Sequence, residues 1–200
     1  MQLYLSNSTT LGTSQLEVER SLGGYLSSSP LRNNNLGNIF SDLIMSQNGQ
    51  EIVEYKAIFL KNTFSDTKTN IYLYYNYPTD PSNIKLEIGV VLPNSAGAIE
   101  RIQSSDSSPL FATFTEANTE TNKVLISSSL ASLSSIGIWL KRTILTKNQK
   151  TDKQLFDAYY IYRPVKEKYE NGDTLTTPEQ AIYDNWNNQV DAINFFIQYD

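Results

Sequence analysis

The chain has 200 residues with 16 basic and 21 acidic side chains, and its net charge of −5 fits one acidic domain of ordinary size. It contains neither cysteine nor histidine, which excludes disulfides, thiolate nucleophiles, the usual zinc sites and a Ser-His-Asp triad. The acidic balance disfavours binding to nucleic acid, and no apolar run approaches the roughly 18 residues of a membrane span.

The first 35 residues are polar and rich in turn-forming residues. Glycine pairs and runs of serine and asparagine recur here, as at Gly23-Gly24 and Asn33–Asn35. This composition is typical of an extended arm or a long loop, which is either disordered or ordered by packing on a neighbour. We therefore expect residues 1–35 to be an N-terminal arm.

Residues 36–163 are expected to form the folded domain, because apolar and polar residues alternate along many short segments. Alternation is clearest at residues 84–92, where Ile84, Leu86 and Ile88 share one face. The same period of two recurs at residues 53–59, 71–77 and 136–141, and more weakly at 98–103, 110–115 and 123–127. The pattern predicts an all-β fold, an antiparallel β-sandwich of about eight strands that is immunoglobulin-like or jelly-roll-like.

Residues 164–200 are expected to form a linker and a C-terminal helix. Before them, residues 155–162 are ambiguous between strand and helix, and their β-branched and aromatic content favours a last strand. Thr177-Pro-Glu-Gln has the order of a helix N-cap, a proline at the first helical position and a capping box. Apolar residues then recur at helical spacing, so we predict an amphipathic helix over Pro178–Ile197.

Charge is divided unevenly over the last 60 residues. Residues 141–170 carry eight basic and four acidic side chains, a net of +4, whereas residues 171–200 carry five acidic and no basic ones, a net of −5. Opposite charges of this kind suit pairing within one subunit or between subunits. The predicted helix therefore either packs on its own sandwich or docks on a neighbouring subunit.

Carboxylates are the remaining candidates for catalysis, since a pair of them can drive glycoside hydrolysis. Most alternate with apolar strand residues and are expected to face solvent: Glu54, Glu87, Glu100, Asp106 and Glu116. The polar loops at 80–83 and 170–173 are interpreted as turns rather than calcium sites. We therefore predict that the protein is not an enzyme and has no metal and no cofactor.

Four tyrosines cluster in one predicted strand: Tyr72, Tyr74, Tyr75 and Tyr77. They support two interpretations. A row of exposed rings is the platform on which carbohydrate-binding sandwiches stack sugars, whereas tyrosine is also a common strand residue whose ring packs while its hydroxyl stays wet.

Aromatic and basic residues in two segments are the candidates for an interface between subunits: Trp139, Lys141, Arg142, Tyr183, Trp186, Phe195 and Phe196. Alternation places Ile138 and Leu140 on one face of their strand, with Arg142 at the end of that face. Trp139 and Lys141 lie on the opposite face. We expect the first face to line the core, with Arg142 at its rim, and Trp139 to point outward as an interface anchor.

Three stretches together resemble virion structural proteins of tailed bacteriophages. They are Leu36-Gly-Asn-Ile-Phe-Ser-Asp-Leu43, Glu54-Tyr-Lys-Ala-Ile-Phe-Leu-Lys-Asn62 and Gly137-Ile-Trp-Leu-Lys-Arg-Thr143. The resemblance covers roughly residues 36–145, and its motifs are structural rather than catalytic. The asparagine- and tyrosine-rich composition is similar to that of crAss-like gut phages, in which such sandwiches resemble parts of the neck rings or the shell.

The resemblance implies a virion structural protein without enzyme activity, assembled in the host cytoplasm. We expect a ring or connector subunit of the head-tail (neck) region, whose partners are copies of itself and portal or tail proteins. Two alternatives remain open at this point. One is a capsid decoration protein, and the other is a carbohydrate-binding module of a tail fibre that takes a glycan.

Overall fold

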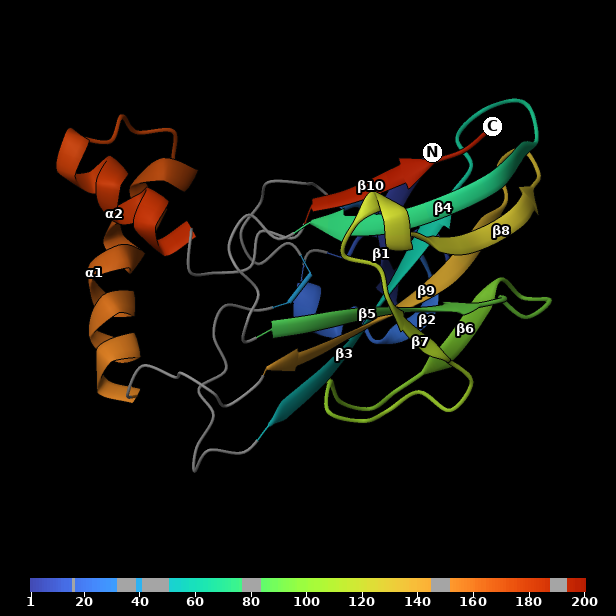
Figure 1. Ribbon diagram of the computed structural model, residues 1–200, viewed down its shortest axis with the longest axis horizontal. Helices are drawn as coiled ribbons and strands as arrows, with labels where there is room; N and C mark the ends of the chain where they lie inside the picture. Colours follow the sequence, from blue (N-terminus) through green and yellow to red (C-terminus); the bar gives the residue numbers. More distant parts are fainter. Residues whose placement is uncertain (16, 32–38, 41–50, 77–83, 145–151, 188–193) are drawn as a thin grey trace.

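The computed structural model of the chain describes residues 1–15, 17–31, 39–40, 51–76, 84–144, 152–187 and 194–200. They form two antiparallel β-sheets and a pair of helices to one side of the sheets (Figure 1). In spatial order, the large sheet is β6 (Ala98–Arg101), β2 (Gly23–Pro30), β1 (Gln2–Asn7), β3 (Ile52–Lys61), β9 (Ser135–Ile144), β5 (Ile84–Val91) and β7 (Phe114–Glu116). The small sheet is β10 (Asn194–Gln198), β4 (Lys68–Asn76) and β8 (Val124–Leu130). The helices are α1 (Asp152–Glu170) and α2 (Thr177–Asn187), and the 3-10 turns are η1 (Val18–Arg20) and η2 (Glu120–Asn122).

Three strand pairs are nested along the sequence. β3 pairs with β9, β4 with β8 and β5 with β7, so that each pair encloses the next one. β5 also pairs with β9, which places the outermost and innermost pairs side by side in the large sheet as β3-β9-β5-β7. The middle pair lies in the small sheet. The two arms of one long hairpin therefore cross from sheet to sheet together.

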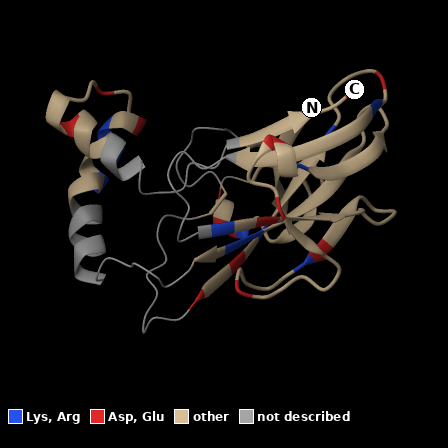
Figure 2. Ribbon diagram, in the orientation of Figure 1, with Lys and Arg blue, Asp and Glu red and all other residues tan. Residues whose placement is uncertain are grey.

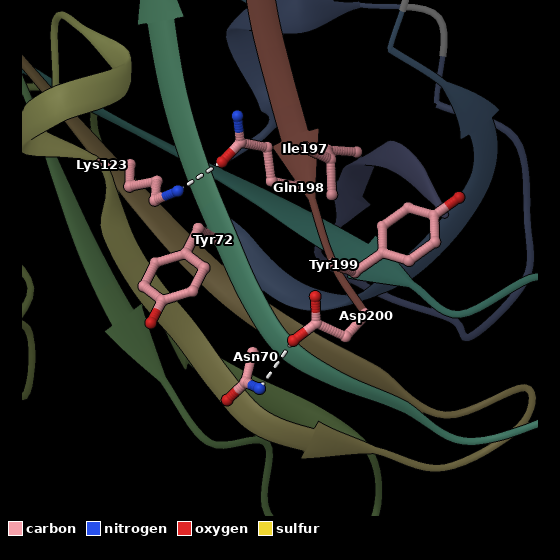
Figure 3. A pocket seen from close by; sticks show the side chains of 7 residues that line it. All are labelled: Asn70, Tyr72, Lys123, Ile197, Gln198, Tyr199 and Asp200. Atoms are coloured by element: carbon pink, nitrogen blue, oxygen red, sulfur yellow. Dashed lines mark hydrogen bonds between the residues drawn. The ribbon is translucent and has the colours of Figure 1, made fainter.

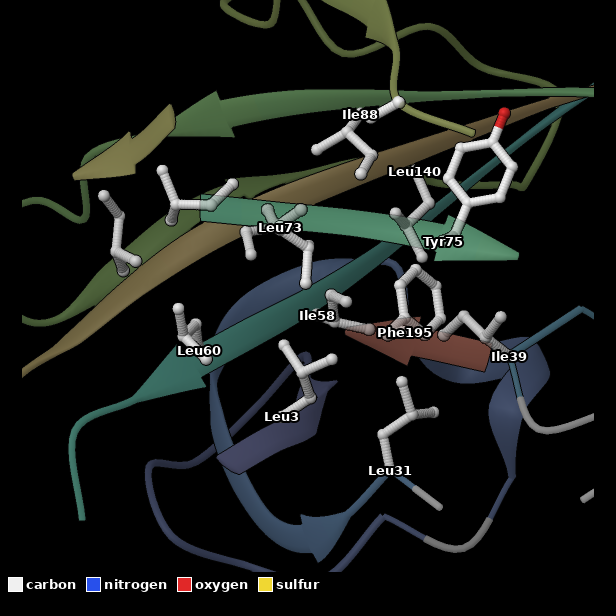
Figure 4. Close-up of a cluster of buried hydrophobic side chains, with 14 of the residues drawn as sticks. Leu3, Leu31, Ile39, Ile58, Leu60, Leu73, Tyr75, Ile88, Leu140 and Phe195 are labelled. Atoms are coloured by element: carbon white, nitrogen blue, oxygen red, sulfur yellow. The ribbon is translucent and has the colours of Figure 1, made fainter. Parts of the chain in front are cut away.

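The main hydrophobic core fills the space between the two sheets (Figure 4). Alternate residues of β3 and β9, such as Ile58 and Leu140, point into it from the large sheet, and Leu73 and Phe195 point into it from the small sheet. Tyr75 of β4 ties the sheets together, because its buried hydroxyl donates a hydrogen bond to the backbone oxygen of Leu86 at 2.5 Å. Burial raises the pKa of this hydroxyl. The expectation of a mostly β fold built from antiparallel sheets is thus confirmed.

A second buried cluster covers the other face of β3 and β9. Its buried members are Tyr55, Ala57, Phe59, Ile99, Ile102 and Trp139. β6 and the residues next to it lie over this face so closely that a Cβ at position 137 would approach the Ile99 side chain to 2.4 Å. Gly137 is therefore required by packing. Because both faces of the central strands are covered, β3 is buried along almost its whole length.

The expectation of an N-terminal arm over residues 1–35 is wrong for the described part of that segment. β1 lies in the interior of the large sheet, between β2 and β3, and its Leu3 and Leu5 belong to the main core. The polar composition favours an arm, but several serines of this segment are buried and form hydrogen bonds inside the fold. The buried hydroxyl of Ser21 accepts a hydrogen bond from the backbone N–H of Ser6 at 2.9 Å and donates one to the backbone oxygen of Ala57 at 2.5 Å.

The strand favoured at residues 155–162 is instead part of helix α1. The apolar residues Tyr162, Val165 and Tyr169 follow a helical period that continues beyond the short window on which the strand prediction relied. Tyr162 and Val165 are buried, and α1 packs against α2. Among the described residues, no helix is long and apolar enough to cross a membrane.

The predicted helix over Pro178–Ile197 differs from the structure at its end. α2 covers residues 177–187, and residues 194–198 form strand β10, which pairs with β4 from Asn194↔Asn76 to Gln198↔Tyr72. Phe195 points into the core and Phe196 points away from it, as strand alternation requires. A short apolar run takes its conformation from its pairing partner, and β4 supplies that partner here.

Candidate functional site

The structure places Trp139 in the interior rather than at an interface. Alternation does put it on the face opposite Ile138 and Leu140, as predicted, but that face is covered by the second buried cluster. The side chain is 0% exposed. The prediction of an outward Trp139 is therefore wrong, because the large sheet curls and its other strands cover this face.

Arg142 is buried in an ion pair instead of lying at a rim. Its Nε donates to Oε2 of Glu54 at 2.8 Å, and its Nη2 donates to the same oxygen. The guanidinium also lies over the ring of Phe40, 4.5 Å from its centre. Glu54 is 3% exposed, so the expectation that it faces solvent is wrong as well. The two residues face each other directly in the register of β3 and β9.

Lys141 is half-buried and forms a salt bridge with Glu87, a second carboxylate that is predicted from the sequence to face solvent. Its Nζ donates to Oε2 of Glu87 at 2.7 Å, and the Nζ of Lys85 donates to Oε1 of Glu87 at 3.1 Å. Glu87 itself is 8% exposed. Burial raises the pKa of Glu87, but the hydrogen bonds from Lys141 and Lys85 outweigh it and hold the pKa below its ordinary value of 4.5.

The salt bridges of Glu87 should contribute to the stability of the fold in a way that depends on pH. A carboxylate whose pKa is lower in the folded than in the unfolded chain stabilises the fold above the unfolded value, and this contribution is lost as the pH falls through the folded one. Between about pH 7 and about pH 3, the wild-type protein should therefore lose more stability than Glu87→Gln. Urea unfolding at several pH values measures the difference, and parallel curves for the two proteins would contradict the prediction.

Tyr183 of α2 contacts two tyrosines of α1. Its ring stacks on Tyr162, with 6.1 Å between ring centres, and contacts Tyr169 at 4.4 Å. Lys168 of α1 donates to Glu179 of α2, which lowers the pKa of Glu179 to about 2. The side chain of Trp186 lies outside the described residues.

The last two predicted interface residues lie on opposite faces of β10. Phe195 is buried in the main core, whereas Phe196 is 41% exposed on the outer side of the small sheet. Phe196 stacks on Tyr74 of β4, with 5.0 Å between ring centres and 14° between ring planes. Of the predicted interface residues that the structure describes, Phe196 is the one placed as an interface anchor would be.

The outer face of the small sheet is the strongest candidate for a functional surface. Strand register aligns two rows of side chains across it: one contains Phe196 and Tyr74, and the other contains Gln198, Tyr72 and Leu125. Leu125 is 48% exposed. Sequence reasoning missed Leu125, although its position between Val124 and Ile126, which both face the core, indicates an outward apolar residue.

An open depression of about 610 Å³ lies at one end of this face (Figure 3). The Nζ of Lys123 lies 4.8 Å from the ring centre of Tyr72 and donates to the side chain of Gln198. Asn70 Nδ2 donates to Oδ2 of Asp200 at 2.8 Å, and the ring of Tyr199 completes the lining. The depression is therefore lined mostly by polar groups that already bind one another.

The hypothesis of a sugar platform finds little support in this geometry. A sugar needs a free aromatic face, but the ring of Tyr74 is stacked on Phe196 and Lys123 lies over Tyr72. Tyr75 is buried in the core, and Tyr77 lies outside the described residues, so the sequence cluster does not form one exposed row.

Metal ligands do not cluster in the part of the chain that the structure describes. No group of three or more His, Cys, Asp or Glu residues there is placed to hold a metal ion. Residues 170–173 form the turn that ends α1, in which Asp173 N–H donates to the backbone oxygen of Lys168. The loop at 80–83 lies outside the described residues.

The edges of the two sheets differ in charge (Figure 2). The edge strands of the large sheet are short and charged: β6 has four residues with Glu100 and Arg101, and β7 has three residues with Glu116. The edge strands of the small sheet, β8 and β10, are seven and five residues long and contain no charged residue. Charge and shortness are two devices by which proteins block an exposed edge. The small sheet uses neither device at β8.

The chain was compared with protein-family models, with curated proteins and with solved structures, and none of the three comparisons gave a match.

Proposed function

We propose that the chain is a non-enzymatic structural subunit that acts by associating with copies of itself through the small sheet. The observation that carries the proposal is the outer face and edges of that sheet. Phe196 and Leu125 are exposed apolar side chains on its two edge strands, and neither strand carries a charge. Exposed aromatic residues on a rigid sheet are the usual anchors of protein interfaces.

Within that class we propose a ring or connector subunit in the virion of a tailed phage, in which portal or tail proteins are the other partners. Two features support this assignment. The three sequence stretches resemble virion structural proteins of that group. The nested pairs β3–β9, β4–β8 and β5–β7 also favour a jelly-roll-like sandwich over an immunoglobulin-like one. Jelly rolls recur in viral shells, and this second support is an analogy at the level of the fold.

The experiment is a measurement of oligomeric state. Purified protein should form a discrete oligomer in native mass spectrometry, and a ring should be visible by negative-stain electron microscopy. A monomer at every concentration up to the solubility limit would overturn the proposal. Retention of such a monomer on a glycan column would favour the carbohydrate-binding alternative instead.

A charge placed on the small sheet should break the oligomer. We expect Leu125→Glu to weaken association by about 30-fold or more, the size of losing an interface anchor worth about 2 kcal/mol. The matched control is Leu92→Glu, which makes the same change at a side chain 79% exposed beyond the end of β5. Sedimentation velocity measures both variants, and circular dichroism checks their folds. Equal weakening by the two variants would show that general charge, not this surface, is responsible.

A further inference from the structure

The directions of the two edge strands of the small sheet suit parallel pairing between copies of the chain. β8 and β10 both run antiparallel to β4, so they run parallel to each other. They lie on opposite sides of β4, and in the described part of the chain each has β4 as its one strand neighbour. A second copy that continues the sheet in the same sense would therefore place its β10 alongside β8, in parallel.

The edge of β8 carries a local sign that its backbone lacks a strand partner. The hydroxyl of Ser127 donates to the backbone oxygen of Ser129 at 2.7 Å and accepts from the backbone N–H of the same residue at 3.3 Å. A single small side chain thus serves both backbone groups that a neighbouring strand would otherwise bind. These bonds are local, and an incoming strand can replace them.

We propose that β8 of one copy pairs in parallel with β10 of the next, so that the small sheets of successive copies join head to tail. This inference rests on the proposed function, because it names the contact by which the copies associate. It accounts for the missing charges on both edges with a single interface. Head-to-tail contacts of this kind give closed rings when the rotation between copies closes.

The outer face fixes which residues meet. An odd shift in register would turn apolar side chains from one face to the other, so outward residues of β8 must lie beside outward residues of β10. The register that removes most apolar surface from water places Leu125 beside Phe196 of the next copy, since these are the exposed large apolar residues of the two strands. No like charges meet in this arrangement.

The absence of cysteine from the chain makes this contact directly testable. The double variant Leu125→Cys with Phe196→Cys should form disulfides between chains under mild oxidation and give a ladder of covalent multimers on a non-reducing gel. A disulfide within one chain is excluded, because β4 separates the two strands by about 10 Å and a disulfide spans at most about 7 Å between Cα atoms. Each single variant should stay uncrosslinked. Both sites are exposed, and circular dichroism confirms that the variants fold.

The outcomes separate this inference from the proposed function. Covalent dimers from either single variant would indicate a two-fold contact between like edges and would overturn the head-to-tail pairing. Native oligomers of the double variant without a covalent ladder would overturn the edge contact but leave self-association intact. Absence of oligomers from the wild-type protein would overturn both. A charged edge gives a second check, since Ser128→Lys should abolish the oligomer if β8 is paired.

Discussion

Replacing Trp139 with alanine should lower the free energy of unfolding by about 3–5 kcal/mol, the usual cost of removing a large aromatic side chain from a core. The indole is 0% exposed and packs in the second buried cluster, where neighbouring side chains on β3 and β6 would be left around a cavity. The subunits should then dissociate only because the fold is weakened. The sequence pattern alone predicts the opposite, a folded monomer with a weakened interface.

A second substitution at this position sharpens the test. The indole N–H of Trp139 has no hydrogen-bond partner among the described residues. An unsatisfied buried donor is itself destabilising. Trp139→Phe removes that donor and retains most of the packing of the ring. We expect it to lose less than half the stability that Trp139→Ala loses. Urea denaturation compares the two variants, with Leu92→Ala as an exposed control. A stable Trp139→Ala monomer that fails to associate would restore the interface hypothesis.

Removing Glu54 should also cost about 3–5 kcal/mol, because the buried guanidinium of Arg142 would lose the carboxylate that faces it across β3 and β9. The side chains are 4% and 1% exposed, so water cannot replace the lost partner. Lys56, on the same strand, is 2% exposed and donates to the backbone oxygen of Glu19 at 2.9 Å. Burial lowers the pKa of Lys56, and Glu54 opposes that shift. Glu54→Gln therefore removes the carboxylate that lies near both of these buried basic side chains.

Removing both partners of the pair should be much less harmful. Apolar replacement of a buried ion pair is often neutral or stabilising, so the double variant Glu54→Met with Arg142→Met should be more stable than Glu54→Gln. A double-mutant cycle built on denaturation curves, with the two methionine single variants, measures the coupling between the residues. Additive effects would show that Arg142 is held by its other contacts, such as Phe40, and not by Glu54.

The strands with the clearest alternation were predictable from the sequence, but the faces of β3 were not. Alternation with a period of two shows which residues of a strand share a face, but it does not show which of the two faces meets the core. Glu54 is charged and is therefore predicted to face solvent, yet it lies on the same side of β3 as Ile58 and Leu60. The partner that makes this possible, Arg142, lies 88 residues away in the sequence.

The candidate surface was predictable only in part, for a similar reason. The sequence pattern predicts Phe196 as an interface residue on a helix; the side chain is exposed, but it lies on strand β10. A five-residue apolar segment fits either conformation, and its pairing with β4 decides the outcome. Leu125 belongs to β8, a strand that the alternation of residues 123–127 predicts only weakly. The contrast in charge between the two sheets requires the strand order, which no local pattern contains.

The nested strand pairs have a consequence for how the chain folds. Pairing β5 with β7 closes the shortest loop, residues 92–113, and each closure shortens the loop that the next pair must close, up to β3 and β9 around residues 62–134. β10 does not belong to these nested pairs, and a much longer stretch of chain separates it from its partner β4. Contacts so distant in sequence form slowly. We therefore expect the small sheet to be the last part of the sandwich to form, with the tyrosine-rich edge of β4 open until then to strands from other chains.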